Sequence, residues 1–324
     1  MGGLLALGVA ANVAFAWASG ALAPAASRLL GSPALYAAAA LALAPWLTHA
    51  ARLLVWARFF GRPLGPRSAL ECVLANEVGS AITPTAVGGG YAKLLLLVQK
   101  GFTPGTAASL MVLGSVEDYA CFLLVLPEAL ALSGGWRPSF AIPGLSHLSH
   151  RAIAIALAVA LLAGVLVTSR AAVRRLHVLT GWRQRLGAAR RDFVAAFRLI
   201  AARGKARIAL TLGLAVVHWA CRFGVAAVLL AAIGSPLNPA RVFLLQLVVY
   251  VAGAVVPTPG GAFGVETVFF LAYRPLVPRE ILPALVASWR LLTFYLPLAL
   301  GAGLFALLQF GRSRPDAAAL PPPA

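Results

Sequence analysis

The chain has 324 residues, of which 61% are hydrophobic and 11% are charged, and its mean hydropathy is +0.88. This composition excludes a soluble domain of this length, so we expect an all-α polytopic membrane protein. The net charge of +18 does not indicate a nucleic-acid partner, because the basic residues lie in short segments between apolar stretches.

The apolar stretches predict about six full transmembrane helices. Their approximate ranges are 4–24, 34–57, 104–132, 151–168, 208–232 and 281–310. The first stretch lacks a basic leader, so we interpret it as a helix and not as a cleaved signal. Basic residues crowd the C-terminal end of the second helix and follow the last one; they are Arg52, Arg58, Arg62, Arg67, Arg312 and Arg314. The positive-inside rule then places both termini in the cytoplasm, and we expect a multi-pass protein of the bacterial cytoplasmic membrane.

The segment 69–100 is apolar but is interrupted by Thr83-Pro-Thr-Ala-Val-Gly-Gly-Gly90. Each arm has roughly 14 residues or fewer, at most ~21 Å as a helix, against a hydrocarbon core of ~30 Å. A hairpin that enters from the cytoplasm and returns therefore fits better than a full crossing. We expect Glu71 and Glu77, on its first arm, to be solvated near the cytoplasmic surface.

The segment 170–207 contains eleven Arg or Lys residues and one acid, Asp192. Its apolar residues recur at helical spacing; they are Phe193, Val194, Phe197 and Ile200. The pattern fits a cytoplasmic helix that lies against anionic lipid headgroups. A plain solvated segment that fixes topology fits equally, and the two interpretations are compatible.

The helix predicted over 208–232 carries His218 and Arg222 on one face, close to mid-membrane. A lone histidine in such a helix is usually a hydrogen-bonded packing residue. An arginine at that depth is costly enough that it should face a partner or a cavity.

The second interruption is Val255-Val-Pro-Thr-Pro-Gly-Gly-Ala-Phe-Gly-Val-Glu266, inside an apolar run. Its prolines lack N–H donors and its glycines permit angles that a helix does not use, so a helix must break here. Broken backbone at membrane depth requires cover by protein or a water-filled cavity. The alternative is a tight turn outside the membrane, which the short flanking arms disfavour.

When the sequence is aligned with itself at an offset of 173 residues, the two interruptions coincide. This alignment maps Pro84 onto Pro257, Thr85 onto Thr258, Gly88 onto Gly261, Lys93 onto Glu266 and Glu117 onto Arg290. Units of about 66–132 and 238–310 would then form an inverted repeat, the transporter pattern with a site near the midplane. We expect a single membrane domain over 1–314 and a disordered proline-rich tail over 315–324.

Glu117 and Arg290 are the charged mates for which we expect direct contact. Each lies about 9 to 11 residues into its helix, or roughly 14–17 Å deep, near the midplane of a ~30 Å core. Contact across a pseudo-two-fold axis would relieve the desolvation of both groups.

The run Pro257-Thr-Pro-Gly-Gly-Ala-Phe-Gly-Val-Glu266, followed by Trp289-Arg-Leu-Leu-Thr-Phe-Tyr-Leu-Pro297, resembles the flippase-like family. This family comprises the transmembrane region of lysylphosphatidylglycerol synthases and their stand-alone relatives. The resemblance implies a translocator that moves a phospholipid, or a modified or isoprenoid lipid, between leaflets.

Two motifs depart from the family pattern. Gly90-Tyr-Ala-Lys93 lacks the family's acid and has Lys for Arg, and Glu117-Asp-Tyr-Ala-Cys121 lacks the family's Arg and displaces its Asp. The substrate can therefore differ from that of other members. No soluble acyltransferase domain is recognisable, so we expect that this chain alone does not aminoacylate a lipid.

A charged headgroup needs shelter at mid-bilayer, which helix N-termini and basic side chains provide. Lys93, Arg222 and Arg290 are the candidate phosphate partners, and the acids could neutralise them, bind a cationic headgroup or carry protons. The full candidate set is Pro84, Gly89, Gly90, Lys93, Glu117, Asp118, Arg222, Pro257, Thr258, Pro259, Gly260, Gly261, Glu266 and Arg290.

No catalytic centre, metal site or cofactor motif stands out, and no Walker A loop indicates nucleotide binding. We therefore expect a transporter, not an enzyme, driven by an ion gradient or by downhill lipid flow. An intramembrane lipid-modifying transferase is the enzymatic alternative. A non-catalytic partner of a separate lipid synthase is the third interpretation.

We predict that the basic segment 170–207 sets topology and contributes no substrate selectivity. Replacing half of its arginines by glutamine should weaken topology or binding to anionic vesicles, by about 1 kcal/mol per residue near the surface. Vesicle sedimentation and protease accessibility measure both effects. A change in which lipid is moved, with topology intact, would contradict the prediction.

Overall fold

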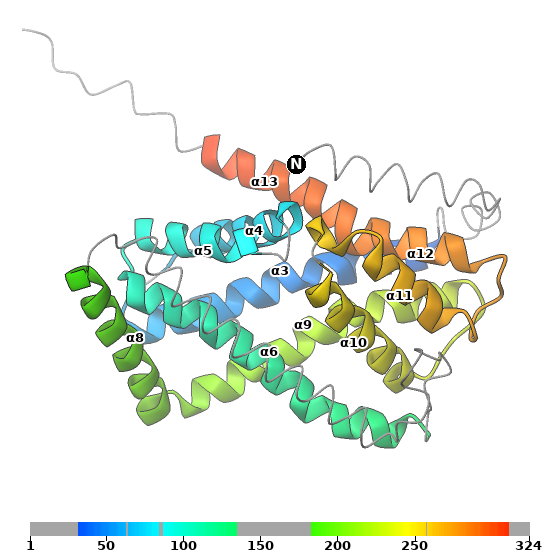
Figure 1. Cartoon of the computed structure of the whole chain (residues 1–324), viewed down its shortest axis with the longest axis horizontal. Helices are drawn as coiled ribbons and strands as arrows, with labels where there is room; N and C mark the ends of the chain where they lie inside the picture. The colour runs from blue at the N-terminus through cyan, green and yellow to red at the C-terminus, as the bar shows by residue number, and fades with distance from the viewer. Residues whose placement is uncertain (1–31, 63, 84–86, 135–182, 257, 311–324) are drawn as a thin grey trace, which may run out of the picture.

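The computed structural model describes residues 32–62, 64–83, 87–134, 183–256 and 258–310. Its elements in chain order are α3 (Pro33–Phe59), α4 (Pro66–Ile82), α5 (Val87–Gln99), α6 (Pro104–Leu132), α8 (Arg183–Arg203), α9 (Lys205–Ala232), α10 (Pro239–Val255), η2 (Pro259–Gly261), α11 (Gly264–Tyr273), α12 (Leu282–Arg290), η3 (Leu291–Tyr295) and α13 (Leu296–Phe310). The fold over these residues is all-α, and it extends along one axis (Figure 1). This confirms the predicted fold class.

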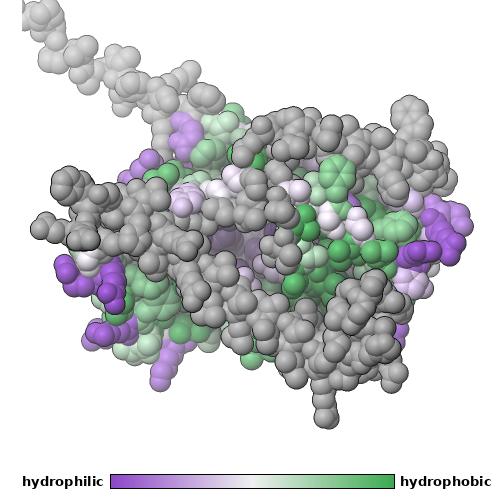
Figure 2. Space-filling view, in the orientation of Figure 1, coloured by the Kyte–Doolittle hydropathy of each residue, from purple (hydrophilic) through white to green (hydrophobic). Residues whose placement is uncertain are grey.

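Four of the described helices are long and apolar enough to cross a membrane. They are Pro33–Phe59, Pro104–Leu132, Lys205–Ala232 and the continuous segment Leu282–Gln309. They agree with four of the six predicted spans, and the other two, 4–24 and 151–168, lie outside the described residues. In Figure 2, hydrophilic residues gather at the two ends of the long axis and hydrophobic residues lie between them.

Two of the long helices, α3 and α6, begin with the local signals expected of helix N-termini. In α3 the Ser32 side chain accepts a hydrogen bond from the Leu35 N–H, and Pro33 occupies the first turn. In α6 Thr103 caps the Thr106 N–H in the same way and Pro104 follows. These caps satisfy backbone donors that have no partner inside the helix.

The first interruption separates two short helices, α4 and α5, of 17 and 13 residues. Their outer ends lie side by side, because the Lys100 Nζ is 3.0 Å from the Ser68 Oγ and 2.6 Å from the Glu71 Oε2. At the other end the arms approach backbone to backbone, and a Cβ at Gly89 would lie 2.1 Å from the Asn76 carbonyl oxygen. The segment is thus a hairpin that closes on itself.

The structure corrects two details of the prediction for this hairpin. Glu71 is not solvated: its side chain is 0% exposed and pairs with Lys100. The interruption is also shorter than Thr83–Gly90, since the helix resumes at Val87 and includes Gly88 to Gly90. These glycines allow close packing of the arms and do not break the helix.

The second interruption separates α10 from α11, and here glycines do adopt non-helical backbone. Gly260 has φ of 63°, and a Cβ on it would also lie 2.2 Å from the Phe294 ring. The turn η2 contacts α4, so the second hairpin reaches the first. Figure 1 shows the hairpins opening toward opposite ends of the molecule, α4–α5 at one and α10–α11 at the other.

The helix bounds recur at the same offset of 173 residues. The offset maps α4 onto 239–255, which are the bounds of α10, and maps α3 onto 206–232, within one residue of α9. These last two helices pack against each other and run in opposite directions along the long axis (Figure 1). The recurrence therefore starts one helix earlier than the two predicted units.

The basic segment is partly a helix that packs on the protein. In α8 the stripe of Ala189, Ala196 and Ile200 is buried, and Phe193 and Phe197 pack against the same cluster. Val194, expected on this face, is exposed. The apolar stripe of α8 thus contacts the protein, and Arg190, Arg191 and Arg198 of the same helix are exposed.

The final span is not a regular α-helix. A π-helical turn, η3, joins α12 to α13 and is followed by Pro297. Single π-turns inside helices are frequent at functional sites. The sequence pattern predicted a continuous helix over 281–310 and did not reveal this turn.

We predict that the ends of the first hairpin face the same side of the membrane. In a cysteine-free background, Gly65→Cys and Gln99→Cys should both react with an impermeant maleimide from one side only. Leu132→Cys, at the far exposed end of α6, should react from the other side. Labelling of the first two cysteines from opposite sides would show that 66–99 crosses the membrane.

Candidate functional site

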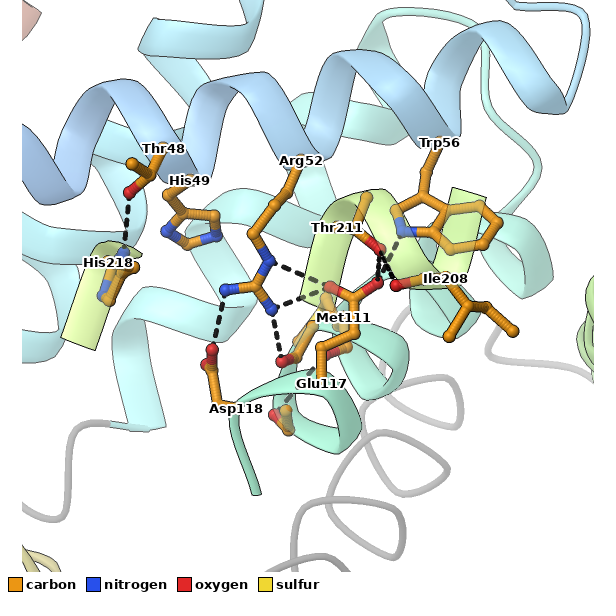
Figure 3. A network of polar contacts seen from close by, with 12 residues as sticks. Thr48, His49, Arg52, Trp56, Met111, Glu117, Asp118, Ile208, Thr211 and His218 are labelled. Atoms are coloured by element: carbon orange, nitrogen blue, oxygen red, sulfur yellow. Dashed lines mark hydrogen bonds and ion pairs between the residues drawn. The ribbon is translucent and has the colours of Figure 1, made fainter. Parts of the chain in front are cut away.

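The densest polar network among the described residues joins α3, α6 and α9 at its centre, Glu117. The Arg52 Nε and Nη2 lie 2.9 and 2.8 Å from the Glu117 Oε2. The other oxygen, Oε1, accepts from the Trp56 Nε1 at 2.7 Å and from the Thr211 hydroxyl (Figure 3). Both carboxylate oxygens of a side chain that is 4% exposed are therefore satisfied.

Asp118 extends this network toward the next face of α6. Its Oδ1 lies 2.6 Å from the Arg52 Nη1 and accepts from the Trp219 Nε1 at 3.2 Å. The Arg52 Nη2 also donates to the Gly114 carbonyl at 2.8 Å. One arginine thus serves two adjacent carboxylates and a backbone oxygen, as the fork geometry of its guanidinium permits.

The predicted contact between Glu117 and Arg290 is wrong. Glu117 pairs with Arg52, and the Arg290 Nε lies 2.8 Å from the Glu266 Oε1. Both charges are buried, but each has a partner in its own half of the chain. Depth along a helix does not determine which neighbour the side chain faces.

Arg290 instead holds the second interruption in place. Its Nη2 donates to the carbonyl of Gly260, inside the break, and its guanidinium lies 4.1 Å from the centre of the Phe294 ring. The contact with Glu266 is an ion pair without hydrogen-bond alignment at Nε. Three elements, η2, α11 and α12, are therefore joined by one side chain.

Lys93, on α5, has an imidazole as its partner. Its Nζ lies 2.8 Å from the His49 Nε2, on α3, and its side chain is buried. Among the described residues no carboxylate forms an ion pair with it at 4.0 Å or less. A second histidine, His218, lies edge-on to His49 and hydrogen-bonds the Thr48 hydroxyl at 3.1 Å (Figure 3).

Arg222, on α9, faces a pocket and not the buried network. Its Nη1 lies 3.8 Å from the Oε2 of Glu77, on α4. Glu77 was expected to be solvated near the cytoplasmic surface, but its side chain is 28% exposed and lines the same pocket as Arg222. The expectation that an arginine at this depth faces a partner or a cavity holds on both counts.

The interruptions supply the remaining candidate residues. Gly89 and Gly90 lie in the first turns of α5 and are buried. The Thr258 hydroxyl donates to the Ala262 carbonyl at 2.9 Å and so closes the second break. Pro259, Gly260 and Gly261 form η2. Pro84 and Pro257 lie outside the described residues.

Three ionisable residues that contact the candidate residues were not themselves in the candidate set from the sequence: Arg52, His49 and Glu77. Arg52 was interpreted as one of several arginines that mark the cytoplasmic end of α3, and His49 and Glu77 received no role. Arg52 could have been recognised, because it lies seven residues inside an apolar helix that continues to Phe59. A charge at that position must be paired or face a cavity.

Among the described residues, no group of three or more His, Cys, Asp or Glu side chains is placed to hold a metal ion. The arrangement consists of ion pairs and hydrogen bonds inside an apolar bundle. Such an arrangement can bind and exchange charged groups.

Comparison with known proteins places this architecture in a family. The family model described as the lysylphosphatidylglycerol synthase TM region matches residues 3–301. A relative described as a UPF0104 membrane protein, from Archaeoglobus fulgidus, is 24% identical over 277 residues, which are 79% of this chain and 81% of the relative. The match confirms the resemblance that the motifs around Pro257 and Trp289 indicated.

We predict strong energetic coupling between Arg52 and Glu117 and none between Glu117 and Arg290. Glu117→Gln or Arg52→Gln alone leaves a buried charge without its partner, which should cost about 3–5 kcal/mol. The double variant should cost less than the sum. Denaturant unfolding in detergent measures both double-mutant cycles.

The cycle between Glu117 and Arg290 is the matched control. Its coupling should stay below roughly 0.5 kcal/mol, as for residues without shared partners. Coupling there as large as in the Arg52 cycle would contradict the assignment of partners.

Proposed function

Because the chain belongs to the lysylphosphatidylglycerol synthase transmembrane-region family, we propose that it moves a phospholipid, or a modified or isoprenoid lipid, between the leaflets of a cell membrane. The observation that carries the proposal is the meeting of two interrupted hairpins, η2 against α4, beside charged side chains in an apolar bundle. The hairpins are re-entrant, and the repeated units are related by an inverted pseudo-two-fold axis.

Translocation requires a path for the headgroup while the acyl chains stay in lipid. Moving a carboxylate- or ammonium-sized ion from water to a medium of dielectric ~4 costs on the order of 20 kcal/mol in the idealised limit. Fixed charges and dipoles in the bundle replace water along the path and lower this cost. The headgroup is the only part of the lipid that needs them.

The contacts divide the candidate residues into two roles. Arg290 and Glu266 stabilise the second break, and Glu117 with Asp118 holds Arg52. These groups form the frame of the site. Lys93 and Arg222 are the cations available to a phosphate, since Lys93 contacts an imidazole and no carboxylate ion pair with it is found among the described residues, and Arg222 is partly exposed.

The protein acts as a transporter and catalyses no covalent step. No ATP-binding motif is present in the sequence, so an ion gradient or the lipid gradient itself supplies the drive. A separate lipid synthase that produces the transported lipid is the expected partner. The basic ends of α3 and α8 face the cytoplasm and contact anionic headgroups there.

We predict that Lys93 is required for transport. Purified protein is placed in liposomes with a fluorescent phospholipid, and an impermeant reductant bleaches the outer leaflet. Wild-type protein should move the fluorescent lipid from the inner to the outer leaflet, where the reductant bleaches it. Lys93→Gln should slow this loss of fluorescence at least about tenfold, which corresponds to ~1.4 kcal/mol of phosphate stabilisation. Lys93→Arg keeps the charge and should retain more of the rate.

Lys205→Gln, at an exposed position at the start of α9, is the matched control and should leave the rate unchanged. Equal rates for Lys93→Gln and wild type would exclude Lys93 as a headgroup ligand. A folded wild-type protein that moves no lipid, even with a cognate synthase present, would contradict the proposed function and favour the role of a non-catalytic partner.

A further inference from the structure

The Glu77–Arg222 pair differs from the buried ion pairs centred on Arg52 and Arg290. Its closest approach is 3.8 Å, whereas the pairs centred on Arg52 and Arg290 approach to 2.6–2.8 Å. Arg222 is 39% exposed and Glu77 28% exposed, against 4% for Arg52. The two groups are close enough to attract each other and are separated enough to admit other partners.

The pair lines a partly open pocket, whose roughly 300 Å³ of unfilled space includes space continuous with the surroundings. The pocket lies between α3, α4, α9 and the last span, and its lining includes Pro45, Trp46, Glu77, Arg222, Thr293 and Pro297. Thr293 belongs to the π-helical turn. The widened turn and two prolines line the same space as the open ion pair.

The pocket lies deep in the bundle along α9. Arg222 is ten residues before the end of α9 at Ala232, so it lies about 15 Å from that end, half of a ~30 Å hydrocarbon core. Exposed charges at such depth are found where they face a cavity that takes up water or a polar ligand.

We propose that this pocket binds the headgroup of a zwitterionic phospholipid, with Arg222 contacting the phosphate and Glu77 contacting the ammonium group. This inference rests on the proposed function in one respect, that the ligand is a lipid. A zwitterion exchanges one long ion pair for two short ones and leaves the net charge of the pocket at zero.

The acid beside the arginine gives the pocket its selectivity. An anionic headgroup without an amine would place its phosphate near Arg222 but also near the unpaired carboxylate of Glu77. A cationic headgroup would likewise be repelled by the positive charge of Arg222. Specificity of this kind comes from repulsion of the wrong ligand as much as from attraction of the right one.

The surroundings favour a lipid over a soluble zwitterion. The span Leu282–Gln309, which contributes Thr293 and Pro297, is apolar, and only 11% of its most apolar window is buried. Its exposed residues Leu291 and Leu300 offer a surface to acyl chains. A headgroup in the pocket can therefore keep its tails against this helix.

The test measures binding by the full-length protein in detergent. Three fluorescent lipids with identical tails are compared: phosphatidylethanolamine, phosphatidylglycerol and a cationic amine lipid. We expect wild type to bind phosphatidylethanolamine at least about tenfold more tightly than the other two. Glycerophosphoethanolamine, the same headgroup without tails, should compete only weakly.

Single neutralisations should change selectivity in opposite directions. Glu77→Gln should raise the affinity for phosphatidylglycerol toward that for phosphatidylethanolamine, and Arg222→Gln should do so for the cationic lipid. The double variant Glu77→Gln with Arg222→Gln removes both charges together, which protects the fold, and should bind all three lipids weakly. Arg279→Gln and Glu280→Gln, exposed outside the pocket, are the controls and should match wild type.

Unchanged selectivity in folded Glu77→Gln and in the double variant would overturn the inference, whatever the transport assay shows. Equally strong competition by glycerophosphoethanolamine would overturn the assignment of a lipid ligand. Selective binding without transport in liposomes would leave this inference standing and contradict the proposed function. Transport of all lipids at one rate, unaffected by Glu77→Gln, would support the proposed function and contradict this inference.

Discussion

The carboxylate of Glu117 is the group on which the centre of the bundle depends. Between helices in a membrane there is little hydrophobic drive, so packing and interhelical hydrogen bonds must hold them together. Glu117 accepts from Arg52 and Trp56 on α3 and from Thr211 on α9, and these helices also pack on each other. Each donor would carry a desolvation cost if the carboxylate were absent, which links three spans through one side chain.

Much of the fold follows from the sequence because the bilayer restricts the choices. Long apolar runs specify α3, α6 and α9, the first two of which begin at a proline. The Pro/Gly breaks specify two hairpins with short arms. The offset that aligned Pro84 with Pro257 also aligns the bounds of α4 and α10. Length and satisfaction of the backbone decide these features, and both can be read from one chain.

The partners of the charged side chains could not be read in the same way. Hydrophobic periodicity and depth give a position along a helix, whereas an ion pair depends on rotation and on which helix lies opposite. Glu117 and Arg290 were expected at similar depths but have different partners, and Arg52 was assigned to the cytoplasmic end although it is buried. Glu71 reached Lys100 because the hairpin returns to its starting point, a contact that only the closed arms create.

The two repeated units pair their buried charges differently. As a result, Lys93 of the first unit has no carboxylate ion pair among the described residues. In the second unit Glu266 pairs directly with Arg290; in the first, the mates Lys93 and Glu117 do not pair, because Arg52 takes the carboxylate. Arg52 maps onto an apolar residue, Val225, so this arginine has no counterpart. Lys93 contacts His49 instead. The offset of 173 residues maps His49 onto Arg222, which lines the pocket. An exact repeat would cancel its charges in pairs, whereas this asymmetry leaves Lys93 beside an imidazole and without a carboxylate ion pair among the described residues. The phosphate contact that we propose for Lys93 depends on this asymmetry.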